Sequence, residues 1–437
     1  MTALDEIRDA IATQQLHTIE LGAVDSYGHL RGKRIPAARF VESVATGGAN
    51  IADAIYIFDV QCAIVDSPFV NMEQGFADMR LVPDLTTFRV LAHRGGYGIV
   101  MADAVDHRGA PHRLSPRQVL QTQVERCRGL GFDPVAAVEL ECYVTTENWE
   151  CAQPHVQYSS LSDAVELEVA VREMREALLG CGVPIESSNA EYGPGQLEIN
   201  FAPADPVTTA DNTALYKMII KEIALRHGLR ATFMAKPWAE HSGSGMHLHT
   251  SLGRGATNVF AGCVDRPDDV MAHWVAGLLA HARAMQLLMI PTPNGYKRVR
   301  PYTFAPTHVH WGRDNRSLLA RCTLGEDRAN RVEYRAAGAD ANAHLALAAV
   351  LAAGCDGLEQ QLSLPPMAEG DLYATPGDHP ELPATPEAAI AAFEGSALAT
   401  MLGADFSANY VVLARNELAH FADAITDWER ARYLEFS

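Results

Sequence analysis

The first part of the chain shows mainly the period-two pattern of strands. Residues 16–36, LHTIELGAVDSYGHLRGKRIP, are predicted to form two strands joined by a turn at Ser26-Tyr27-Gly28. Further short strands are expected at 54–60, 88–92 and 100–109. Helical periodicity is sparse here apart from residues 3–14. Residues 1–108 are therefore predicted to form a small, mostly β domain.

Helical patterns begin at residue 115. Ser115 can cap a helix, Pro116 suits its first turn, and Gly129 closes it. Four later segments are also expected to be helical: 163–182, 211–228, 267–290 and 340–362. The Pro-rich stretch 364–386 is interpreted as an ordered surface loop before a closing helix. Residues 109–437 are therefore predicted to form a larger domain of mixed helices and strands.

Composition narrows the class of protein. The chain has 437 residues, 48% of them hydrophobic, and a formal net charge of −19. This acidic balance argues against a nucleic-acid or anionic-membrane partner, because both require a basic face. The sequence has no run of about 18 apolar residues. Its first residues lack the basic start and apolar segment expected of a secretory leader, and the eight cysteines form no CxxC pair. A globular protein of the reducing cytoplasm, without a zinc site or a disulfide framework, is expected.

Acidic and imidazole side chains recur at alternate positions of the strand-like segments in the second domain. They are Glu139 and Glu141, Glu191 and Glu198 around a Gly-Pro-Gly turn, His247 and His249, and Glu333 between Arg331 and Arg335. On any one strand, such residues could simply form the solvent-facing side of an antiparallel sheet. Repetition on four strands favours a shared pocket instead.

Five carboxylates in one pocket would need cations. At ~5 Å and an effective dielectric constant of about 20, each like-charge pair costs about 3 kcal/mol. Oxygen-rich ligation with imidazole favours Mg²⁺ or Mn²⁺, whereas zinc would favour cysteine and more histidine. The pattern therefore predicts a divalent-metal site.

Arginines form a second candidate group: Arg298, Arg316, Arg321, Arg331 and Arg335. Scattered arginines are often merely solvated, but beside a metal cluster their forked guanidinium groups suit phosphate oxygens and a substrate carboxylate. The chain has no GxxxxGK[ST] segment, so a nucleotide site would not be a P-loop. Gly243 and Gly245 would allow the backbone to approach a ligand closely.

Five segments occur in an order that resembles the glutamine synthetase family over nearly the whole chain. They are VELECY, EYGPGQLEINF, FMAKPWAEHSGSGMHLHTSL, NGYKRVRPYTFAPTHVHWGRDNRS and RVEYRAAGADANAHLALAAVLAAG. The resemblance implies an α+β fold with a small N-terminal β-grasp domain and a large catalytic domain around a curved antiparallel sheet. It also implies a homo-oligomer, commonly a dodecamer of two hexameric rings, with each active site shared between neighbours.

The resemblance also assigns roles to residues of this chain. Metal ligands would be Glu141, Glu191 and Glu198 at one position and Glu139, His247 and Glu333 at another, with two to three Mg²⁺ or Mn²⁺ ions per site. Glutamate would be held by Ser242, Gly243, Arg298 and Arg335. Contacts to ATP would come from His249, Ser251, Arg321 and Arg331, and Arg316 would contact the transferring phosphate.

The chemistry implied is a two-step ligation. The γ-carboxylate of glutamate attacks the terminal phosphate of ATP, and an amine then displaces phosphate from γ-glutamyl phosphate. Metals and arginines would act by positioning and by neutralising charge. No covalent enzyme nucleophile is needed, and no convincing Ser/His/Asp arrangement is present in the sequence.

The chain departs from the family pattern where ammonia-using members bind their nucleophile. A glutamate that precedes Ala-Pro in those enzymes is Phe304 here, Ser242 replaces an asparagine, and Asp53 is the best candidate for the ammonium-binding aspartate. A less anionic, more apolar pocket favours an organic amine over ammonium. Alkylammonium ions have a pKa of about 10, so they still need a proton acceptor before they can attack. Arylamines are largely neutral at pH 7 and need less help. Polyamines fit less well, because their several positive charges would require more carboxylates in the pocket.

The prediction is therefore a γ-glutamyl–amine ligase. Two alternatives stay open at this point. One is a glutamine synthetase in which Phe304 merely packs the loop, and the other is a non-catalytic relative that acts as a scaffold or sensor.

Overall fold

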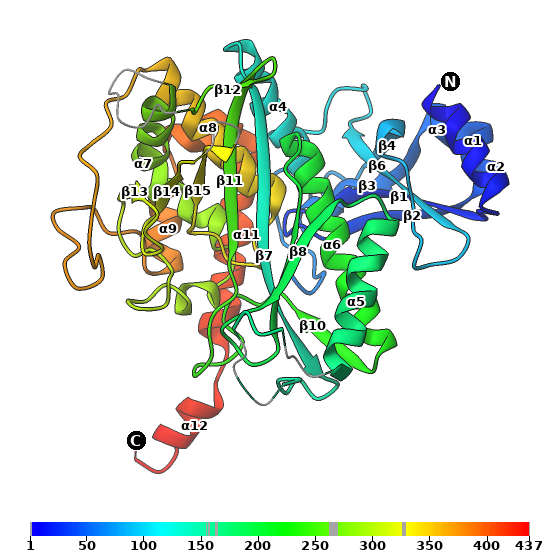
Figure 1. The fold of residues 1–437 in the computed structure, drawn as a ribbon. Coiled ribbons are helices and arrows are strands. Elements are labelled where there is room, and N and C mark those ends of the chain that lie inside the picture. Colours follow the sequence, from blue (N-terminus) through cyan, green and yellow to red (C-terminus); the bar gives the residue numbers. More distant parts are fainter. Residues whose placement is uncertain are drawn as a thin grey trace.

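The computed structural model describes residues 2–436 except 154, 156–157, 162–164, 262–269 and 326–328. Two β-sheets organise this α+β chain, a six-stranded one near the N-terminus and a nine-stranded one that follows (Figure 1). The last strand of the first sheet ends at Val105 and the next helix begins at Pro116. This transition lies beside the predicted boundary at 108/109.

The first sheet has the order β2-β1-β6-β4-β3, with β5 paired to β6. Its strands are β1 (Thr18–Val24), β2 (Leu30–Pro36), β3 (Ala49–Ala52), β4 (Asp78–Pro83), β5 (Arg89–Val90) and β6 (Tyr97–Val105). Helical elements of this part are α1 (Ala3–Thr13), α2 (Ala37–Arg39), the π-helical η1 (Phe40–Val44), α3 (Ala45–Gly47), η2 (Asp53–Tyr56) and η3 (Leu85–Thr87). The predicted hairpin in 16–36 is confirmed, since β1 and β2 pair antiparallel from Thr18↔Pro36 to Val24↔Leu30.

The strand predicted at 54–60 is wrong. The strand of this region, β3, ends at Ala52, and the chain then turns into the 3-10 helix η2. Ala54, Ile55 and Tyr56 are all buried in succession. A strand would have sent alternate side chains to opposite faces, whereas a helical turn buries all three.

The second sheet has the order β13-β14-β15-β11-β7-β9-β8, and β10 and β12 pair with β7 and β11. Its strands are β7 (Asp133–Thr146), β8 (Ile185–Ala190), β9 (Gln196–Phe201), β10 (Leu229–Thr232), β11 (Met246–Arg254), β12 (Thr257–Asn258), β13 (Trp311–Arg313), β14 (Ala320–Thr323) and β15 (Arg331–Tyr334). Every pairing is antiparallel except that of β13 with β14. The long strands β7 and β11 run side by side through the centre of this curved sheet (Figure 1).

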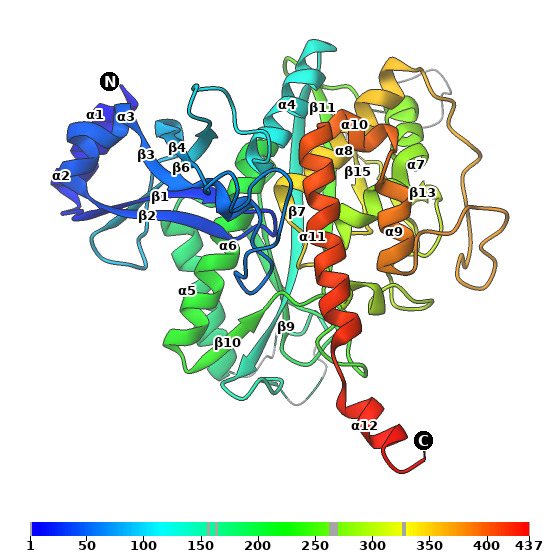
Figure 2. The ribbon, with the colours of Figure 1, turned by 180° about the vertical axis from the view of Figure 1, so that it is seen from behind.

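Helices pack on one side of this sheet, as Figure 2 shows from behind. They are α4 (Pro116–Gly129), α5 (Val165–Gly180), α6 (Pro206–Arg226), α7 (Val270–Met289), α8 (Ala343–Glu359), α9 (Pro386–Phe393), α10 (Ala397–Leu402) and α11 (Ala404–Asp423), with the short η4 (Gly295–Lys297). The last helix, α12 (Asp427–Tyr433), projects away from the sheet. The predicted cap is confirmed, because the Ser115 side chain accepts a hydrogen bond from the backbone N–H of Gln118. The main core contains Leu140 and Leu248 from the sheet and Trp274 from α7.

Alternation along β7 determines which side chains lie away from this core. Its even-numbered residues from 134 to 142 are buried, and its odd-numbered residues from 135 to 141 are only partly so. Glu139 and Glu141 therefore share the face that the helices leave open.

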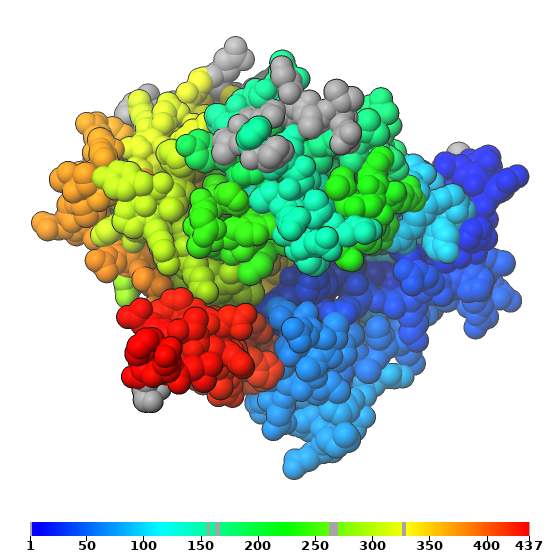
Figure 3. Space-filling model, turned by 90° about the horizontal axis from the view of Figure 1, so that it is seen from below, coloured from blue at the N-terminus to red at the C-terminus, as the bar shows by residue number. Residues whose placement is uncertain are grey.

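Helix α11, near the C-terminus, contacts the N-terminal part of the chain. Asn409 on α11 accepts a hydrogen bond from Ser67 Oγ (2.7 Å) and donates one to the carbonyl oxygen of Tyr56 (3.1 Å). Figure 3 shows the red C-terminal residues beside the blue N-terminal part. None of the helices in the described part of the chain has the length and apolar content needed to cross a bilayer.

Candidate active site

The strand register brings the predicted acidic and imidazole residues into cross-strand pairs. Glu139 on β7 is opposite His247 on β11, and His249 on β11 is opposite Glu333 on β15. Along the other edge of β7, which pairs with β9, Glu141 is opposite Glu198. Four adjacent strands thus deliver six of these side chains to one face of the sheet.

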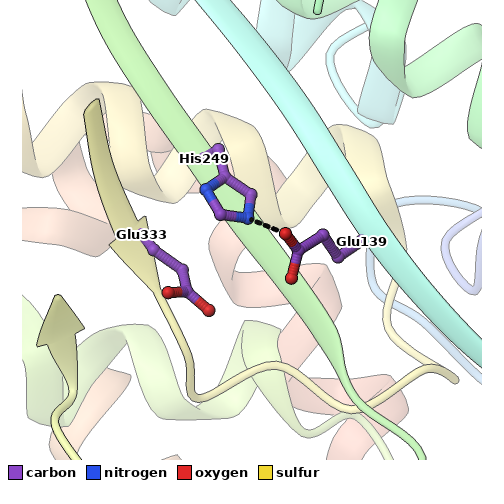
Figure 4. A group of neighbouring side chains, drawn as sticks. All are labelled: Glu139, His249 and Glu333. Carbon is purple, nitrogen blue, oxygen red and sulfur yellow. Dashed lines mark ion pairs between the residues drawn. The ribbon is translucent and has the colours of Figure 1, made fainter. Parts of the chain in front are cut away.

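Glu139, His249 and Glu333 form a compact group at the centre of this face (Figure 4). One potential ligand atom from each lies within 4.8 Å of the others, and His249 Nε2 lies 3.0 Å from Glu139 Oε1. His247 Nδ1 faces the same carboxylates, 3.5 Å from Glu139 Oε2 and 3.6 Å from Glu333 Oε1. Both histidines of the GMHLH segment therefore border this position.

The pKa values of these side chains favour the protonation states that bind a cation. Burial alone would raise the pKa of Glu139, but hydrogen bonding with His247 and His249 lowers it overall. Burial opposes ionisation of Glu333 too, yet Arg335 and then His247 lower its pKa to about 2. Burial, assisted by Arg335, lowers the pKa of His247 to about 4. Two carboxylates and a neutral imidazole are the protonation states that metal ligation requires.

A second acidic group lies beside the first. Burial, followed by repulsion from Glu191, raises the pKa of Glu141 to about 7. Burial, followed by repulsion from Glu139 and Glu141, raises the pKa of Glu198 to about 8. Burial also raises the pKa of Glu191. Burial and mutual repulsion of clustered carboxylates produce shifts in this direction, and the all-oxygen donor set fits Mg²⁺ or Mn²⁺.

Polar residues that the sequence analysis did not single out orient this second group. The amide of Gln196, only 1% exposed, donates to Glu141 Oε2 (3.1 Å) and to the Gly243 carbonyl oxygen (3.0 Å). Asn200 Nδ2 donates to Glu198 Oε1 at 2.8 Å. The signal was present in the sequence, since Gln196, Glu198 and Asn200 alternate along β9 and so share one face.

Arg298 is packed against the glycines of the GSGSG segment. Its side chain is 5% exposed, and Arg298 Nη1 donates to the Ala336 carbonyl oxygen at 3.2 Å. A Cβ atom added to Gly243 or Gly245 would lie 2.7 Å from atoms of this arginine. The absent side chains therefore make room for Arg298, which refines the expectation that these glycines serve a close backbone approach to a ligand.

Arg335 connects three parts of the candidate site. Its guanidinium donates to the Glu333 carboxylate, to the Arg316 carbonyl oxygen (3.2 Å) and to the Phe304 carbonyl oxygen (3.4 Å). The side chain is fully buried, at 2% exposure. Loss of Arg335 would leave a buried carboxylate and two loops without this shared partner.

The loop that carries Phe304 is held from both sides. Phe304 and Tyr302 adopt positive φ values of 58° and 63°, and both side chains are exposed. Thr303 Oγ1 donates to the Arg298 carbonyl oxygen at 2.9 Å, and the Tyr373 hydroxyl donates to the Ala305 carbonyl oxygen at 3.0 Å. The backbone is thus fixed while the Phe304 ring, 59% exposed, points away from the protein core.

A cavity of about 530 Å³ opens at one end of the carboxylate face. Its lining includes Glu139, His249, Ser251 and Arg331, residues predicted to contact metal or ATP. Arg331 Nε donates to His249 Nδ1 at 3.1 Å. The volume lies within the range of small-molecule and cofactor sites.

The remaining predicted residues are placed as follows. Arg321 Nη1 donates to Glu333 Oε2 at 2.7 Å, so it borders the metal-ligand group. Arg316 is exposed, and its charge acts on Glu191. The carbonyl oxygen of Ser242 accepts from the Tyr143 hydroxyl at 2.7 Å.

Asp53 does not lie with the metal-ligand residues of its own chain. It lies in η2 next to the first sheet, where Asp78 and Arg113 are the charged residues acting on it. A role for Asp53 in the site stays a prediction that requires a neighbouring copy.

Comparisons with known proteins agree with this geometry. The family model described as glutamine synthetase, catalytic domain, matches residues 113–433. Gamma-glutamylethanolamide synthetase GlnA4 of Streptomyces coelicolor is 35% identical, covering 99% of this chain and 96% of that protein. Glutamate–isopropylamine ligase of a Pseudomonas species is 34% identical, with 98% and 97% covered. The glutamine synthetase of Thermus thermophilus is 33% identical, with 98% of each covered.

Solved structures extend the likeness to three dimensions. The structure described as apo GmaS without ligand superposes with a TM-score of 0.87 at 28% identity and covers 98% of both chains. The fold, the strand-borne carboxylates and the sequence matches all point to one family. The chain belongs to the glutamine synthetase family of ATP-dependent carbon–nitrogen ligases.

Proposed function

We propose that this protein joins the γ-carboxylate of glutamate to an organic amine, with ATP as the co-substrate and γ-glutamyl phosphate as the intermediate. The observation that supports this proposal best is the apolar ring of Phe304, 59% exposed on a loop that is bonded directly to buried Arg335. A carboxylate at this position would attract ammonium, whereas a phenyl ring offers apolar contact to an organic substituent.

The carboxylate face supplies the metal ligands in this proposal. Glu141, Glu191 and Glu198 would hold one Mg²⁺ or Mn²⁺ ion, and Glu139, His247 and Glu333 a second. Bound cations would neutralise charge on the phosphates of ATP. His249 borders the same group as His247, so it would orient Glu139 and face the nucleotide at the cavity end of β11.

The arginines would position the acid and the transferring phosphate. Arg298 and Arg335 would hold the substrate carboxylate with the Ser242-Gly243 backbone, because both guanidinium groups are buried and fixed. Arg321 and Arg331 border the metal group and the cavity, where ATP phosphates would lie. Exposed Arg316 would neutralise charge as phosphate is transferred.

The names of the relatives favour small alkylamines as the class of nucleophile. Two of them are described as a gamma-glutamylethanolamide synthetase and a glutamate–isopropylamine ligase, and another, 31% identical, as a gamma-glutamylputrescine synthetase. An alkylammonium must lose a proton before it attacks. Asp53 from a neighbouring copy is our candidate acceptor, which would make the active site a property of the homo-oligomer.

The test is a phosphate-release assay with glutamate, ATP and Mg²⁺ across ammonium, alkylamines, diamines and arylamines. We expect the highest kcat/KM with an organic amine. The highest value with ammonium would make the protein a glutamine synthetase. No ATP turnover with any amine would favour a scaffold or sensor.

A second experiment tests the intermediate. With glutamate labelled by ¹⁸O in its γ-carboxylate, attack on ATP places one labelled oxygen in the released phosphate. We expect one ¹⁸O atom per phosphate by mass spectrometry. Unlabelled phosphate accompanied by amide product would rule out γ-glutamyl phosphate.

A further inference from the structure

A buried thiol outside the carboxylate face is joined to a histidine and, through it, to a carboxylate. Cys181 follows the last turn of α5, His93 lies in the turn between β5 and β6, and Glu222 lies on α6. Cys181 Sγ is 3.6 Å from His93 Nδ1, and His93 Nε2 is 2.9 Å from Glu222 Oε2. The three side chains form a thiol–imidazole–carboxylate series between the first sheet and the helices of the second.

The carboxylate of this series determines which histidine nitrogen faces the thiol. Burial alone would raise the pKa of Glu222, but hydrogen bonds from His93 and Arg94 lower it overall. An ionised carboxylate only accepts hydrogen bonds, so His93 Nε2 carries a hydrogen and Nδ1 is left to accept from the Cys181 thiol. A nucleophile, a base and a third group that orients the base make up an activated nucleophile.

Positively charged side chains surround the series. Arg94 Nε donates to Glu222 Oε2 at 2.8 Å. Arg89 on β5 donates to the carbonyl oxygen of Cys181 at 3.4 Å, and Arg226 on α6 donates to that of His93. Nearby cations favour the thiolate form of a cysteine.

The imidazole distinguishes Cys181 from other cysteines at the same depth. Burial alone would lower the pKa of His93, but its bonds with Cys181 and Glu222 raise it overall, as a base requires. Cys142 and Cys322 are as deeply buried, and no histidine contacts either sulfur within the described residues. Burial raises the pKa of each of these two thiols to about 12. Neighbours rather than depth therefore make Cys181 a candidate for reaction.

Only a thin cover separates this thiol from solvent. Cys181 is 1% exposed, whereas its neighbours Gly180 and Gly182 and Ala92 of the facing turn are exposed. A Cβ atom added to Gly180 would lie 2.7 Å from Ala92 Cβ, so the turn packs directly on the end of α5. Local opening of such a turn costs less free energy than global unfolding. A small oxidant can enter during this opening, whereas a bulky reagent is excluded.

We propose that Cys181 is a peroxide-sensitive thiol, which His93 activates for oxidation to a sulfenic acid by hydrogen peroxide. His93 Nδ1 takes the thiol proton, and the thiolate sulfur attacks one peroxide oxygen. The S–O bond forms as the O–O bond breaks, so sulfur loses two electrons and the peroxide gains them. The leaving hydroxide takes the proton from His93 and becomes water. This inference does not depend on the proposed ligase function.

The experiment measures the oxidation rate of each cysteine in the folded, full-length protein. The protein is treated with hydrogen peroxide for timed intervals, and catalase then removes the oxidant. Urea containing dimedone unfolds the protein and labels sulfenic acids, which are quantified for each tryptic peptide by mass spectrometry. At pH 7 we expect Cys181 to be oxidised about tenfold faster than Cys151, a less buried thiol whose pKa is raised by burial.

His93→Gln removes the base and keeps a polar side chain beside Glu222. We expect oxidation of Cys181 to slow about a hundredfold. The matched control is His227→Gln, because His227 Nε2 pairs with Glu173 Oε2 at 2.7 Å and contacts no thiol among the described residues. This control should leave the rate unchanged. Equal rates in the wild type and His93→Gln would overturn the proposal.

The pH profile of the wild type provides a test that needs no variant. Because the thiol proton moves to His93 and not to solvent, the rate at Cys181 should change less than about threefold between pH 7 and 8.5. The rate at Cys151 should increase more than about tenfold, since its thiolate fraction rises with pH. Parallel increases at both cysteines would contradict the role of His93. Absence of label on Cys181 after a treatment that labels exposed Cys62 would also overturn the site.

Discussion

Arg335 donates a hydrogen bond to the Phe304 carbonyl oxygen at 3.4 Å while its other amino group bonds the Glu333 carboxylate. One buried guanidinium therefore links the loop proposed to select the amine to a carboxylate proposed to hold metal. The backbone of Phe304 is fixed by this bond, and its exposed ring is free to meet a substrate. The side chain at this position can thus change selectivity without moving the catalytic group.

Phe304→Glu should shift the enzyme toward ammonium. A carboxylate on the fixed loop would attract an ammonium ion and accept its proton, and it would remove apolar contact to an organic substituent. We expect kcat/KM for ammonium to rise about tenfold and that for the preferred amine to fall by a similar factor, equivalent to about 1.4 kcal/mol each. Steady-state kinetics with both nucleophiles measures the change.

Phe304→Leu is the matched control for this substitution. It keeps an apolar side chain and should retain the preference for the organic amine. If Phe304→Glu folds normally and gains no activity with ammonium, the ring does not set the choice of nucleophile.

Tyr373→Phe should loosen the Phe304 loop from its other side. The variant loses the hydrogen bond to the Ala305 carbonyl oxygen but keeps a ring to pack against Tyr302, 5.2 Å away between centroids. Loss of one such bond is worth about 1 kcal/mol, so the KM for the amine should rise about fivefold. The KM for ATP should stay constant, and an equal rise in both values would indicate general disruption instead.

Glu198→Gln should stabilise the metal-free protein and weaken its response to metal. Glu141 and Glu198 are directly opposite on adjacent strands, and burial with like-charge repulsion raises the pKa of both. Removal of one charge should add about 1–2 kcal/mol of stability without metal. In the wild type, Mg²⁺ at a hundredfold excess over its Kd should raise the free energy of unfolding by about 2.7 kcal/mol. The same concentration should raise it much less in the variant.

Thermal unfolding with EDTA and with Mg²⁺ tests this prediction. Asn200→Asp offers a contrasting variant, because it adds a charge beside Glu198 and should destabilise the metal-free form. A wild-type protein whose melting temperature does not respond to Mg²⁺ would contradict the proposed metal site.

His112 should make the fold sensitive to mild acid. Burial, assisted by Arg113, lowers its pKa to about 4, and the ring accepts a backbone hydrogen bond from Leu114 at Nδ1. The unfolded chain takes up this proton near pH 6.5, so the stabilising contribution of His112 is complete above that pH and is lost as pH falls toward 4.

Between pH 7.5 and 5, this single group should remove about 2 kcal/mol of the free energy of unfolding. His112→Asn keeps an acceptor and cannot titrate, so its loss of stability over the same range should be smaller by that amount. Urea unfolding at both pH values provides the comparison. Parallel losses in the two proteins would show that His112 does not titrate as described.

The sequence predicts those parts of the candidate site that depend on alternation of side chains within one strand. Glu139 and Glu141 share a face because β7 is a regular strand with a buried even-numbered side. The pairing of His249 with Glu333, in contrast, depends on the register of strands about 80 residues apart, which no local pattern specifies. The motif resemblance did not supply this pairing either, because it grouped Glu333 with Glu139 and His247 and assigned His249 to ATP.

Other features escaped prediction for physical reasons. The strand expected at 54–60 is a 3-10 turn because tertiary packing buries three consecutive side chains there. Gln196 was not predicted as a site residue because its amide carries no charge, although it alternates with Glu198 along β9. The bond from Arg335 to Phe304 joins residues 31 apart through a loop with positive φ values, which the sequence pattern does not encode.

The most direct test of the central claim is a competition in one reaction vessel. The protein is given glutamate, ATP and Mg²⁺ with equal concentrations of ¹⁵N-ammonium, ethanolamine, isopropylamine, putrescine and aniline, and the amide products are quantified by mass spectrometry. The account predicts that a γ-glutamyl amide of an organic amine dominates at early times. Predominance of ¹⁵N-glutamine would contradict it.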